Sequence, residues 1–568
     1  MSQREMQALG WKELDVLLVS GDAYVDHPSF GTPLLGRWLQ AHGFRVGIVA
    51  QPRWDSLEDI QKLGRPRLFA GIGAGALDSM LAHYTAFRKL RRDDAYTPGG
   101  RSGARPNRAC IVYANLIRRA FPGLFVVLGG IEASLRRISH YDFWTDKVRR
   151  SILLDSKADL VLYGMAERAV LDLARLLDRT SSRKPSPEDL LAIPGAVFAC
   201  RPNQLPSSPL GLELPSHEAI LASPDALLQA TALLEGHVHL GRDTAIQQSG
   251  DRLVVLTPPS DPLSEREMDA LYSLPFARRA HPSYTEAVPA AEMIAASVTT
   301  HRGCGGGCSF CSLALHQGRR ISSRSRRSIL KEVGGMTAMP DWKGGISDVG
   351  GPSANMWGAR CLLKSEACRR ASCLHPDVCR FFEVDQRAVL TLLEEIRGLP
   401  GVRHVRVASG VRFDLLLQDR EAAELLIEGF VGGQLKLAPE HFSDRVLNLM
   451  RKPRFKVFEQ FLDLFQSRSA RVGKKQFVVP YLMSAFPGCT NQDMAALSRW
   501  LRKRGWQPQQ VQCFVPTPGT MATAMYYARK DFKGDPLFVA RTDAERLAQH
   551  QLLVEKPGTP WRGKGKSD

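Results

Sequence analysis

The sequence of 568 residues lacks long hydrophobic runs, and no stretch approaches the roughly 18 apolar residues that span a bilayer. Its start, MSQREMQALGWKELD, is polar and carries an acidic residue early, unlike a secretory signal. The 11 cysteines are not spread as a disulfide framework; seven of them fall into two groups between residues 304 and 379. We therefore expect a protein of the reducing cytoplasm with no membrane partner.

Acidic residues are also in short supply, with 58 Asp and Glu against 76 Lys and Arg, a net charge of +18. Such a charge attracts anions over long distances and makes nucleic acid a candidate partner. Arginine is dense at 87–94 and 318–331, but aromatic residues make up only 8% and rarely interleave with the basic ones.

The most informative cysteines are spaced Cys304-x3-Cys308-x2-Cys311 in the run SVTTHRGCGGGCSFCSLALHQG. Three thiolates can hold three irons of a 4Fe–4S cluster and leave the fourth iron open. An open iron can bind the amino and carboxylate groups of S-adenosylmethionine (SAM). A zinc site is the alternative, with His301 or His316 completing the ligand set.

A second group is spaced Cys361-x6-Cys368-x4-Cys373-x5-Cys379, without the C-x2-C pairs typical of zinc ribbons. These four thiols form a candidate second metal site, which can close around a second 4Fe–4S cluster or bind zinc. Reduced thiols without a metal are the third reading. The remaining cysteines occur singly on apolar segments, which is typical of core residues: Cys110, Cys200, Cys489 and Cys513.

Short apolar runs alternate with helical patterns over residues 1–180, at 15–20, 44–50, 124–130 and 159–164. This alternation predicts an α/β domain with a doubly wound parallel sheet of Rossmann type. Residues 181–290 are rich in Pro and Ser and predict a connector with short helices. We expect these helices and a strand in the run RLVVLTPP to pack against the neighbouring domain. Residues 531–568 predict a basic C-terminal tail, ending in PWRGKGKSD.

Residues 291–530 repeat a strand followed by an amphipathic helix six times. Six units are too few for an eight-stranded barrel, so we expect an open (β/α)6 partial TIM barrel. The cysteine-rich insertion 361–379 interrupts it. Sites on such barrels lie at the carboxyl ends of the strands, and Cys304 follows the first predicted strand.

These residues resemble the radical SAM superfamily, whose cluster motif has this spacing with an aromatic residue, here Phe310, before the last cysteine. Nearly the whole chain is similar to the YgiQ-type radical SAM proteins. The runs that carry the resemblance appear in order as THRGCGGGCSFC, SDVGGPSANMWG, CRRASCLHPDVC, ASGVRFD, LKLAPEH, PYLMSAFPGCT and FVPTPGTMATAMYY.

The resemblance implies that the three loop cysteines bind the cluster and that several strand ends bind SAM. Gly350 and Gly351 stand where related enzymes bind the methionine amino group through Gly-Gly-Glu, but Pro352 replaces the glutamate here. Ser409 and Glu440 correspond to contacts with the ribose or carboxylate. Pro480 and Gly519 lie where the adenine rests.

The run GLFVVLGGIEASLRR resembles the Gly-Gly turn of cobalamin-binding domains that precede many radical SAM barrels. The chain lacks their D-x-H-x-x-G loop, because His27 comes one position too early in DHPSFG. Cobalamin is therefore a candidate cofactor without a histidine ligand, and a domain that only shapes the substrate cavity is the alternative.

Together these features predict an enzyme that cleaves SAM reductively and abstracts hydrogen from a substrate that the sequence does not specify. A flavodoxin or ferredoxin would supply the electron. Two other functions stay open: radical modification of tRNA or other RNA, with or without cobalamin, and a zinc–thiolate scaffold that is not an enzyme.

Overall fold

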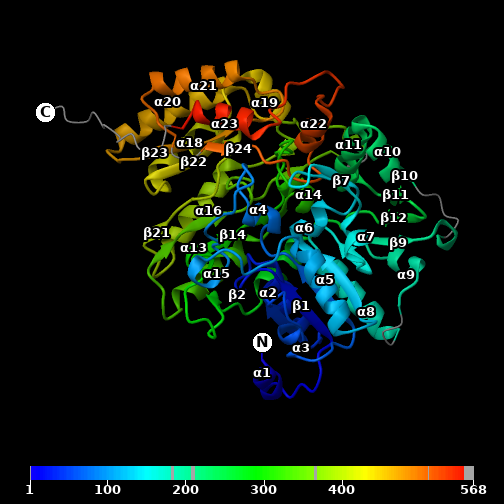
Figure 1. The fold of residues 1–568 in the computed structure, drawn as a ribbon. Helices are drawn as coiled ribbons and strands as arrows, with labels where there is room; N and C mark the ends of the chain where they lie inside the picture. Colours follow the sequence, from blue (N-terminus) through cyan, green and yellow to red (C-terminus); the bar gives the residue numbers. More distant parts are fainter. Residues whose placement is uncertain (1, 181–183, 206–210, 364–366, 509–510, 555–568) are drawn as a thin grey trace.

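The computed structural model describes residues 2–180, 184–205, 211–363, 367–508 and 511–554. The N-terminal part, blue through cyan to green in Figure 1, contains a sheet of nine strands in the order β10-β11-β12-β9-β8-β5-β4-β1-β3. Its last five strands are mutually parallel, which confirms the predicted parallel α/β sheet. These are β1 (Val16–Ser20), β3 (Val46–Ala50), β4 (Phe69–Gly73), β5 (Phe125–Gly129) and β8 (Leu160–Leu162).

Helices cover both faces of this sheet because successive strand residues point to opposite sides. Leu17 and Val19 of β1 pack in one core with α5 (Ala109–Ala120) and α7 (Ile152–Ser156). Val16 and Leu18 pack in the other core with α2 (Gly31–Ala41) and α8 (Glu167–Arg179). The apolar runs of the sequence are therefore strands buried on both faces.

The prediction of a connector over 181–290 needs correction. Residues 196–256 continue the same sheet, and β9 pairs antiparallel with both β8 and β12. Four of the five residues of AVFAC and the last three of RLVVL are buried where these runs pair, which favours strands of the main sheet over a connector. The added elements are β9 (Ala196–Cys200), β10 (Leu212–Leu214), β11 (Ala245–Ser249), β12 (Arg252–Leu256), α9 (Pro187–Leu191), α10 (His217–Ala222) and α11 (Pro224–Leu240).

The second part of the chain contains strands at each of the six predicted places. β14 pairs in parallel with β18, β17 with β21, and β22 and β24 with β23 between them. Their assembly into one open barrel stays a prediction. The strands are β14 (Ser297–Thr299), β17 (Gly345–Ile346), β18 (Asp348–Gly350), β21 (His404–Val405), β22 (Gln434–Glu440), β23 (Phe477–Ser484) and β24 (Val511–Cys513).

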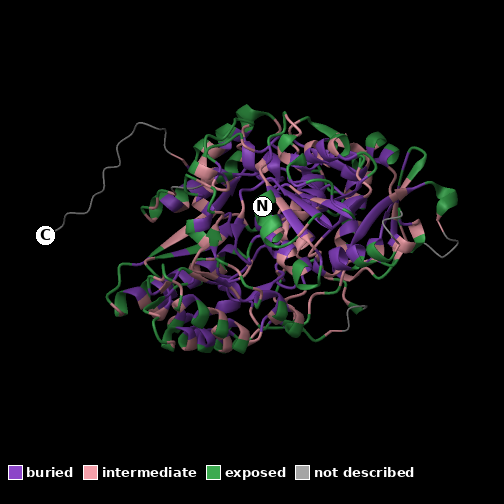
Figure 2. Cartoon of the chain, turned by 90° about the horizontal axis from the view of Figure 1, so that it is seen from below, coloured by how far each residue is buried: buried purple, intermediate pink, exposed green. Residues whose placement is uncertain are grey.

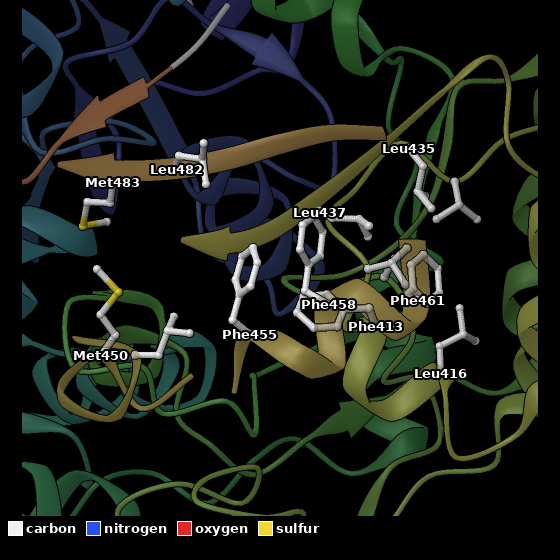
Figure 3. Close-up of a cluster of buried hydrophobic side chains, with 14 of the residues drawn as sticks. Phe413, Leu416, Leu435, Leu437, Met450, Phe455, Phe458, Phe461, Leu482 and Met483 are labelled. Carbon is white, nitrogen blue, oxygen red and sulfur yellow. The ribbon is translucent and has the colours of Figure 1, made fainter. Parts of the chain in front are cut away.

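Amphipathic helices cover these strands and bury one apolar face each. Figure 3 shows Phe455, Phe458 and Phe461 of α20 directed toward Leu435 and Leu437 of β22. Figure 2 shows that buried residues fill the interior of both parts. The helices are α15 (Arg326–Thr337), α16 (Gln386–Gly398), α17 (Phe413–Leu416), α18 (Arg420–Gly429), α19 (Asp444–Met450), α20 (Phe455–Arg471), α21 (Asn491–Lys503) and α22 (Met521–Ala528).

The expected C-terminal tail is also partly structured. Helix α23 (Asp543–Gln551) buries Arg546 and Gln549 completely. The Arg546 guanidinium donates to the backbone oxygens of Ala86 and Phe514, so the helix ties the two parts of the molecule together. The run PWRGKGKSD lies outside the described residues.

Short elements complete the described chain, and none of its helices has the length and apolar character that a bilayer crossing requires. They are α1 (Gln3–Ala8), β2 (Val25–Asp26), α3 (Glu58–Gln61), α4 (Ser79–His83), α6 (Gly130–Leu135), β6 (His140–Asp142), β7 (Lys147–Arg149), α12 (Glu265–Tyr272), β13 (Arg279–Ala280), α13 (Pro289–Ile294), β15 (His301–Arg302), α14 (Leu313–His316), β16 (Ser322–Ser323), β19 (Arg360–Cys361) and β20 (Phe382–Glu383), with 3-10 turns at Pro98–Gly100 and Pro202–Gln204.

Candidate thiol site

The loop that carries Cys304, Cys308 and Cys311 follows the first strands of the second part of the chain. It runs from β15 to α14, just after β14 pairs with β18. Its middle is anchored by Ser309, whose N–H donates to the oxygen of Met450 at 3.1 Å and whose hydroxyl donates to that of Leu449 at 2.7 Å. We refer to residues 303–311 as the cluster loop.

Two glycines allow the cluster loop to pass close to its neighbours. Gly303 has a φ of 85°, and a Cβ there would lie 2.3 Å from the backbone oxygen of Arg320. Gly307 has a φ of 57°, and a Cβ there would lie 2.4 Å from the oxygen of Ala371. Only glycine accommodates both the left-handed backbone and these contacts.

The three thiols are half-buried and lie near one another. A Cβ on Gly306 would stand 3.4 Å from the sulfur of Cys304 and 3.7 Å from that of Cys308. Burial, and then the neighbouring Cys308 and Cys304, raise the pKa of Cys311 to about 12. Burial and Cys308 raise that of Cys304 as well. Without a metal these thiols therefore favour the protonated form, and a metal that binds them would displace the protons.

Their spacing fits a cluster better than a single ion. Zinc–sulfur bonds of about 2.3 Å draw thiolates closely together around one zinc. Among the described residues, no three Cys, His, Asp or Glu side chains are close enough to share one metal ion. The thiolates of a 4Fe–4S cluster stay farther apart because iron and sulfide atoms lie between them. The donor set of this loop fits that larger group.

Two buried ion pairs lie beside the thiols. The guanidinium of Arg412 donates to Asp414, with 2.8 Å from Nε to Oδ1, and a Cβ on Gly306 would lie 3.1 Å from its Nη1. Burial disfavours the charge on Arg412, but Asp414 and then Cys308 and Cys304 raise its pKa above the ordinary value. The cation is therefore kept charged next to the thiols.

The second pair joins Lys452 to Glu440, with 3.7 Å between Nζ and Oε1. Burial raises the pKa of Glu440 despite the lysine. Lys452 also acts on Cys304 and Cys311, whose pKa values it lowers against the effect of burial. Two cations, Arg412 and Lys452, thus act on this thiol group.

A cavity of about 1080 Å³ opens beside Cys308 and Cys311. Its other wall is formed by α11 of the N-terminal part, where Glu235 forms an ion pair with Arg451 at 3.0 Å. Arg451 also donates to the oxygen of Gly307 at 3.3 Å. The cavity therefore lies between the N-terminal part and the cluster loop.

The structure places the predicted SAM-binding glycines on the adjacent strand. Gly350 ends β18, and its oxygen accepts from the N–H of Thr300 at 2.7 Å. A Cβ on Gly351 would lie 2.6 Å from the oxygen of His301, so the turn packs tightly on the first strand. This close packing explains why a residue without a side chain stands at position 351, which the resemblance did not explain.

The other five predicted residues are more scattered. Ser409 donates its hydroxyl to Asp348, and Phe310 stacks edge-on against Phe486 with 6.2 Å between ring centres. Gly519 has a φ of 76° and faces the oxygen of Leu135 in α6, where a Cβ would stand 3.1 Å away. Glu440 is buried beside Lys452, and Pro480 lies in β23. None of the seven lines the 1080 Å³ cavity in the described part of the chain.

Sequence reasoning gave no role to the charged residues beneath the cluster loop. Arg412 and Asp414 stand in the quoted run ASGVRFD, where an Arg and an acidic residue two positions apart are a weak signal of an ion pair. Lys452 and Arg451 follow α19 and belong to no quoted run. Their position became evident only from the packing of α17 and α19 against the loop.

The four cysteines of the insertion come together around a second cavity of about 740 Å³. Cys373 is buried, Cys368 and Cys379 are half-buried and Cys361 is exposed. The pKa of Cys373 is raised to about 11, chiefly by burial, and the other three thiols are near enough to contribute. The insertion also rests on the cluster loop, since the N–H of Cys373 donates to the oxygen of Gly305 at 2.9 Å.

His27, which stands one position before the place of the cobalt ligand in the D-x-H-x-x-G loop, makes a different contact in the structure. His27 is buried, its Nε2 lies 2.8 Å from Nη1 of Arg278, and burial and that arginine lower its pKa to about 3. A small cavity of about 120 Å³ lies at the carboxyl ends of β1, β4 and β5, bordered by Gly73, Gly129 and Asp22. The glycines of this edge leave room for a ligand, but His27 faces a cation.

Several arginines of the basic run 318–331 are not on the surface. Arg324 is 1% exposed and pairs with Glu332, and Arg319 is 9% exposed. Arg302, just before the run, pairs with Glu167 of α8 in the interior. Arg319 and Arg324 therefore do not belong to a basic surface, whereas Arg326 and Arg327 of the same run are exposed.

The N-terminal part is a parallel-sheet domain, and strand–helix units follow it, with three thiols after the first of their strands. This arrangement is typical of the class of radical SAM proteins. The family model Radical SAM N-terminal matches residues 1–297. The UPF0313 protein of Geobacter sulfurreducens is 51% identical over 551 residues, covering 96% of this chain and 90% of the relative. That of Thermotoga maritima is 47% identical over 567 residues, covering 98% of each chain. The chain belongs to the UPF0313 family of radical SAM proteins.

Among solved structures, the chain is similar in fold to the radical S-adenosylmethionine methyltransferase TsrM from Kitasatospora setae, whose structure contains a tryptophan substrate and the SAM analog aza-SAM. The TM-score is 0.51 at 14% identity, covering 90% of this chain and 75% of that chain. At this identity the likeness concerns the fold alone.

Proposed function

We propose that this protein is a radical SAM enzyme in which Cys304, Cys308 and Cys311 hold a 4Fe–4S cluster with one open iron. When bound, such a cluster supplies one electron to the sulfonium of SAM, and the 5′-deoxyadenosyl radical that results abstracts hydrogen from a substrate. The observation that carries the proposal is the position of three neighbouring thiols at the end of the first barrel strand, beside a large cavity.

The residues of the chain have distinct tasks in this proposal. Arg412 and Lys452 offset the negative charge of the thiolates, which lowers the cost of burying them. The backbone of Gly350 and Gly351 lies next to the loop and can contact the amino group of SAM. Ser409 is already bonded to Asp348, so we assign it a positioning role at the end of the third strand.

The substrate would occupy the cavity between α11 and the cluster loop. Its volume suits a molecule of the size that enzymes commonly enclose. Arg319, Arg370 and Lys533 border it together with Glu235 and Asp243. The walls come from both parts of the molecule, so the N-terminal part would shape the substrate site whether or not it binds cobalamin.

We further propose a boundary between two domains near residue 297, where the N-terminal family model ends and β14 begins. The barrel would then extend to about residue 530 with the insertion 361–379 within it. A cytoplasmic flavodoxin or ferredoxin is the electron donor that this reading implies.

Replacement of one cluster thiol tests the proposal. After anaerobic reconstitution with iron and sulfide, Cys308→Ala is expected to lose the iron of this site and to form no 5′-deoxyadenosine from SAM under dithionite. Cys513→Ala, which removes a buried thiol that belongs to neither thiol group and lies in a separate small core, should behave as wild type. Unchanged SAM cleavage by Cys308→Ala would falsify the ligand assignment.

A further inference from the structure

In the described residues of the cysteine-rich insertion, the four thiols border one cavity. Strands β19 and β20 pair antiparallel at its base and set Cys361 opposite Phe382. Within the unit, the N–H of Cys379 donates to the oxygen of Cys373 at 2.7 Å, and the N–H of Phe382 donates to that of Cys379 at 2.8 Å. Four thiols from separate turns are thereby brought onto the wall of the 740 Å³ cavity.

An unpaired cation also faces this cavity from outside the insertion. Arg319 is 9% exposed, and its Nη2 donates to the backbone oxygen of Arg370 at 2.8 Å. Its Nη1 is buried and has no hydrogen-bond partner among the described residues. A buried guanidinium nitrogen without a partner is costly, so the site calls for an anionic group in the cavity.

The four thiols border a common cavity but are not gathered on one point, which bears on the anionic group that fits. One zinc ion needs its ligands within bonding distance of a single point. In the described chain no three candidate side chains, these thiols included, are placed that closely. A 4Fe–4S cluster spans the gap between thiolates with its own iron and sulfide, and a cluster closed by four thiolates remains anionic.

We propose that Cys361, Cys368, Cys373 and Cys379 bind a second 4Fe–4S cluster, whose negative charge is offset by Arg319. All four irons of this cluster have a protein thiolate, so it has no open position for SAM. It adjoins the first site, because the hydroxyl of Ser372 donates to the oxygen of Gly306 at 2.5 Å and Cys373 to that of Gly305. Each thiol gives up its proton when it binds iron.

The test counts iron and acid-labile sulfide in the full chain after anaerobic reconstitution with ferrous iron and sulfide. Wild type should contain about eight iron atoms per chain, and the triple variant Cys304→Ala, Cys308→Ala, Cys311→Ala about four. The triple variant should show the electron paramagnetic resonance signal of a reduced 4Fe–4S cluster that SAM does not change. Cys513→Ser, with one buried thiol removed elsewhere, should keep the full iron content.

The exposed Cys361 allows a variant with little risk to folding, and Cys361→Ser should lower the iron content of the second site while the first site still cleaves SAM. Arg319→Met should lose the second signal more readily than Arg319→Lys. The proposal would be overturned if the triple variant contained no iron. It would also be overturned if wild type contained one zinc per chain that Cys361→Ser removes. These outcomes concern only the second site and do not contradict the proposed function. If wild type contained eight irons per chain but did not cleave SAM, the proposed function alone would be contradicted.

Discussion

The ion pair beneath the cluster loop allows a quantitative prediction. Arg412 Nη1 and the Cys304 sulfur lie 3.1 and 3.4 Å from the same point, the Cβ position of Gly306, so they are at most about 6.5 Å apart. At about 6.5 Å and an effective dielectric constant of about 20, two unit charges interact by about 2.5 kcal/mol. Loss of the guanidinium charge should therefore weaken retention of an anionic cluster by roughly 70-fold, since 1.36 kcal/mol is tenfold.

The perturbation must avoid leaving Asp414 buried and unpaired, which alone costs about 3–5 kcal/mol. The double variant Arg412→Met, Asp414→Asn removes both charges. Asp414→Asn alone keeps the guanidinium, so it should hold iron at least as well as wild type. The exposed pair of Arg387 and Asp419, joined at 2.7 Å, provides the matched control Arg387→Met, Asp419→Asn.

The assay is the release of iron from reconstituted protein to a competing chelator under anaerobic conditions, with SAM cleavage measured on the same samples. We expect wild type, the surface control and Asp414→Asn to retain iron about equally and the Arg412 double variant to retain it less. The loss should stay below about 70-fold, because removal of the Asp414 carboxylate also removes its repulsion of the anionic cluster. Equal iron retention by the two double variants would refute the reasoning that Arg412 stabilises the thiolate site by its charge.

Two further predictions concern the cluster loop and the N-terminal part. Gly303→Ala should lower the melting temperature and the iron content more than Gly318→Ala. Both glycines have a φ near 84°, but only a Cβ at Gly303 would meet a backbone oxygen, at 2.3 Å. Equal effects of the two substitutions would refute the steric argument. Burial, opposed by Arg105, raises the pKa of Asp22 to about 6, so stability should fall as pH rises from about 4 to about 6, by about 3 kcal/mol in total. Asp22→Asn should abolish this fall, as followed by thermal melts across that pH range, and an unchanged pH profile would contradict it.

Much of the architecture could be predicted from local patterns. The apolar runs at 15–20 and 124–130 are strands because they bury side chains on both faces, and α20 is a helix because its apolar residues recur at helical spacing. The strand at 252–256 could be predicted from its apolar run, but the sequence suggested a connector there. That this run and the run at 196–200 extend the main sheet depends on their pairing with β8 and with each other.

The sequence by itself determined the first thiol site, because Cys304, Cys308 and Cys311 lie within one short loop whose glycines permit the tight path. Neighbours in sequence stay neighbours in space, whatever the rest of the chain does. It also indicated that four more thiols lie close together, but not what faces them.

Only the tertiary structure decided which charges surround the thiols. Arg412, Lys452 and Arg319 come from segments far apart in the chain, and nothing in their local sequence distinguishes a buried cation from a solvated one. The same holds for Arg324, which looked like part of a basic surface and is an interior ion pair. Burial depends on which helices and loops pack together, and packing between distant segments is set by the whole fold.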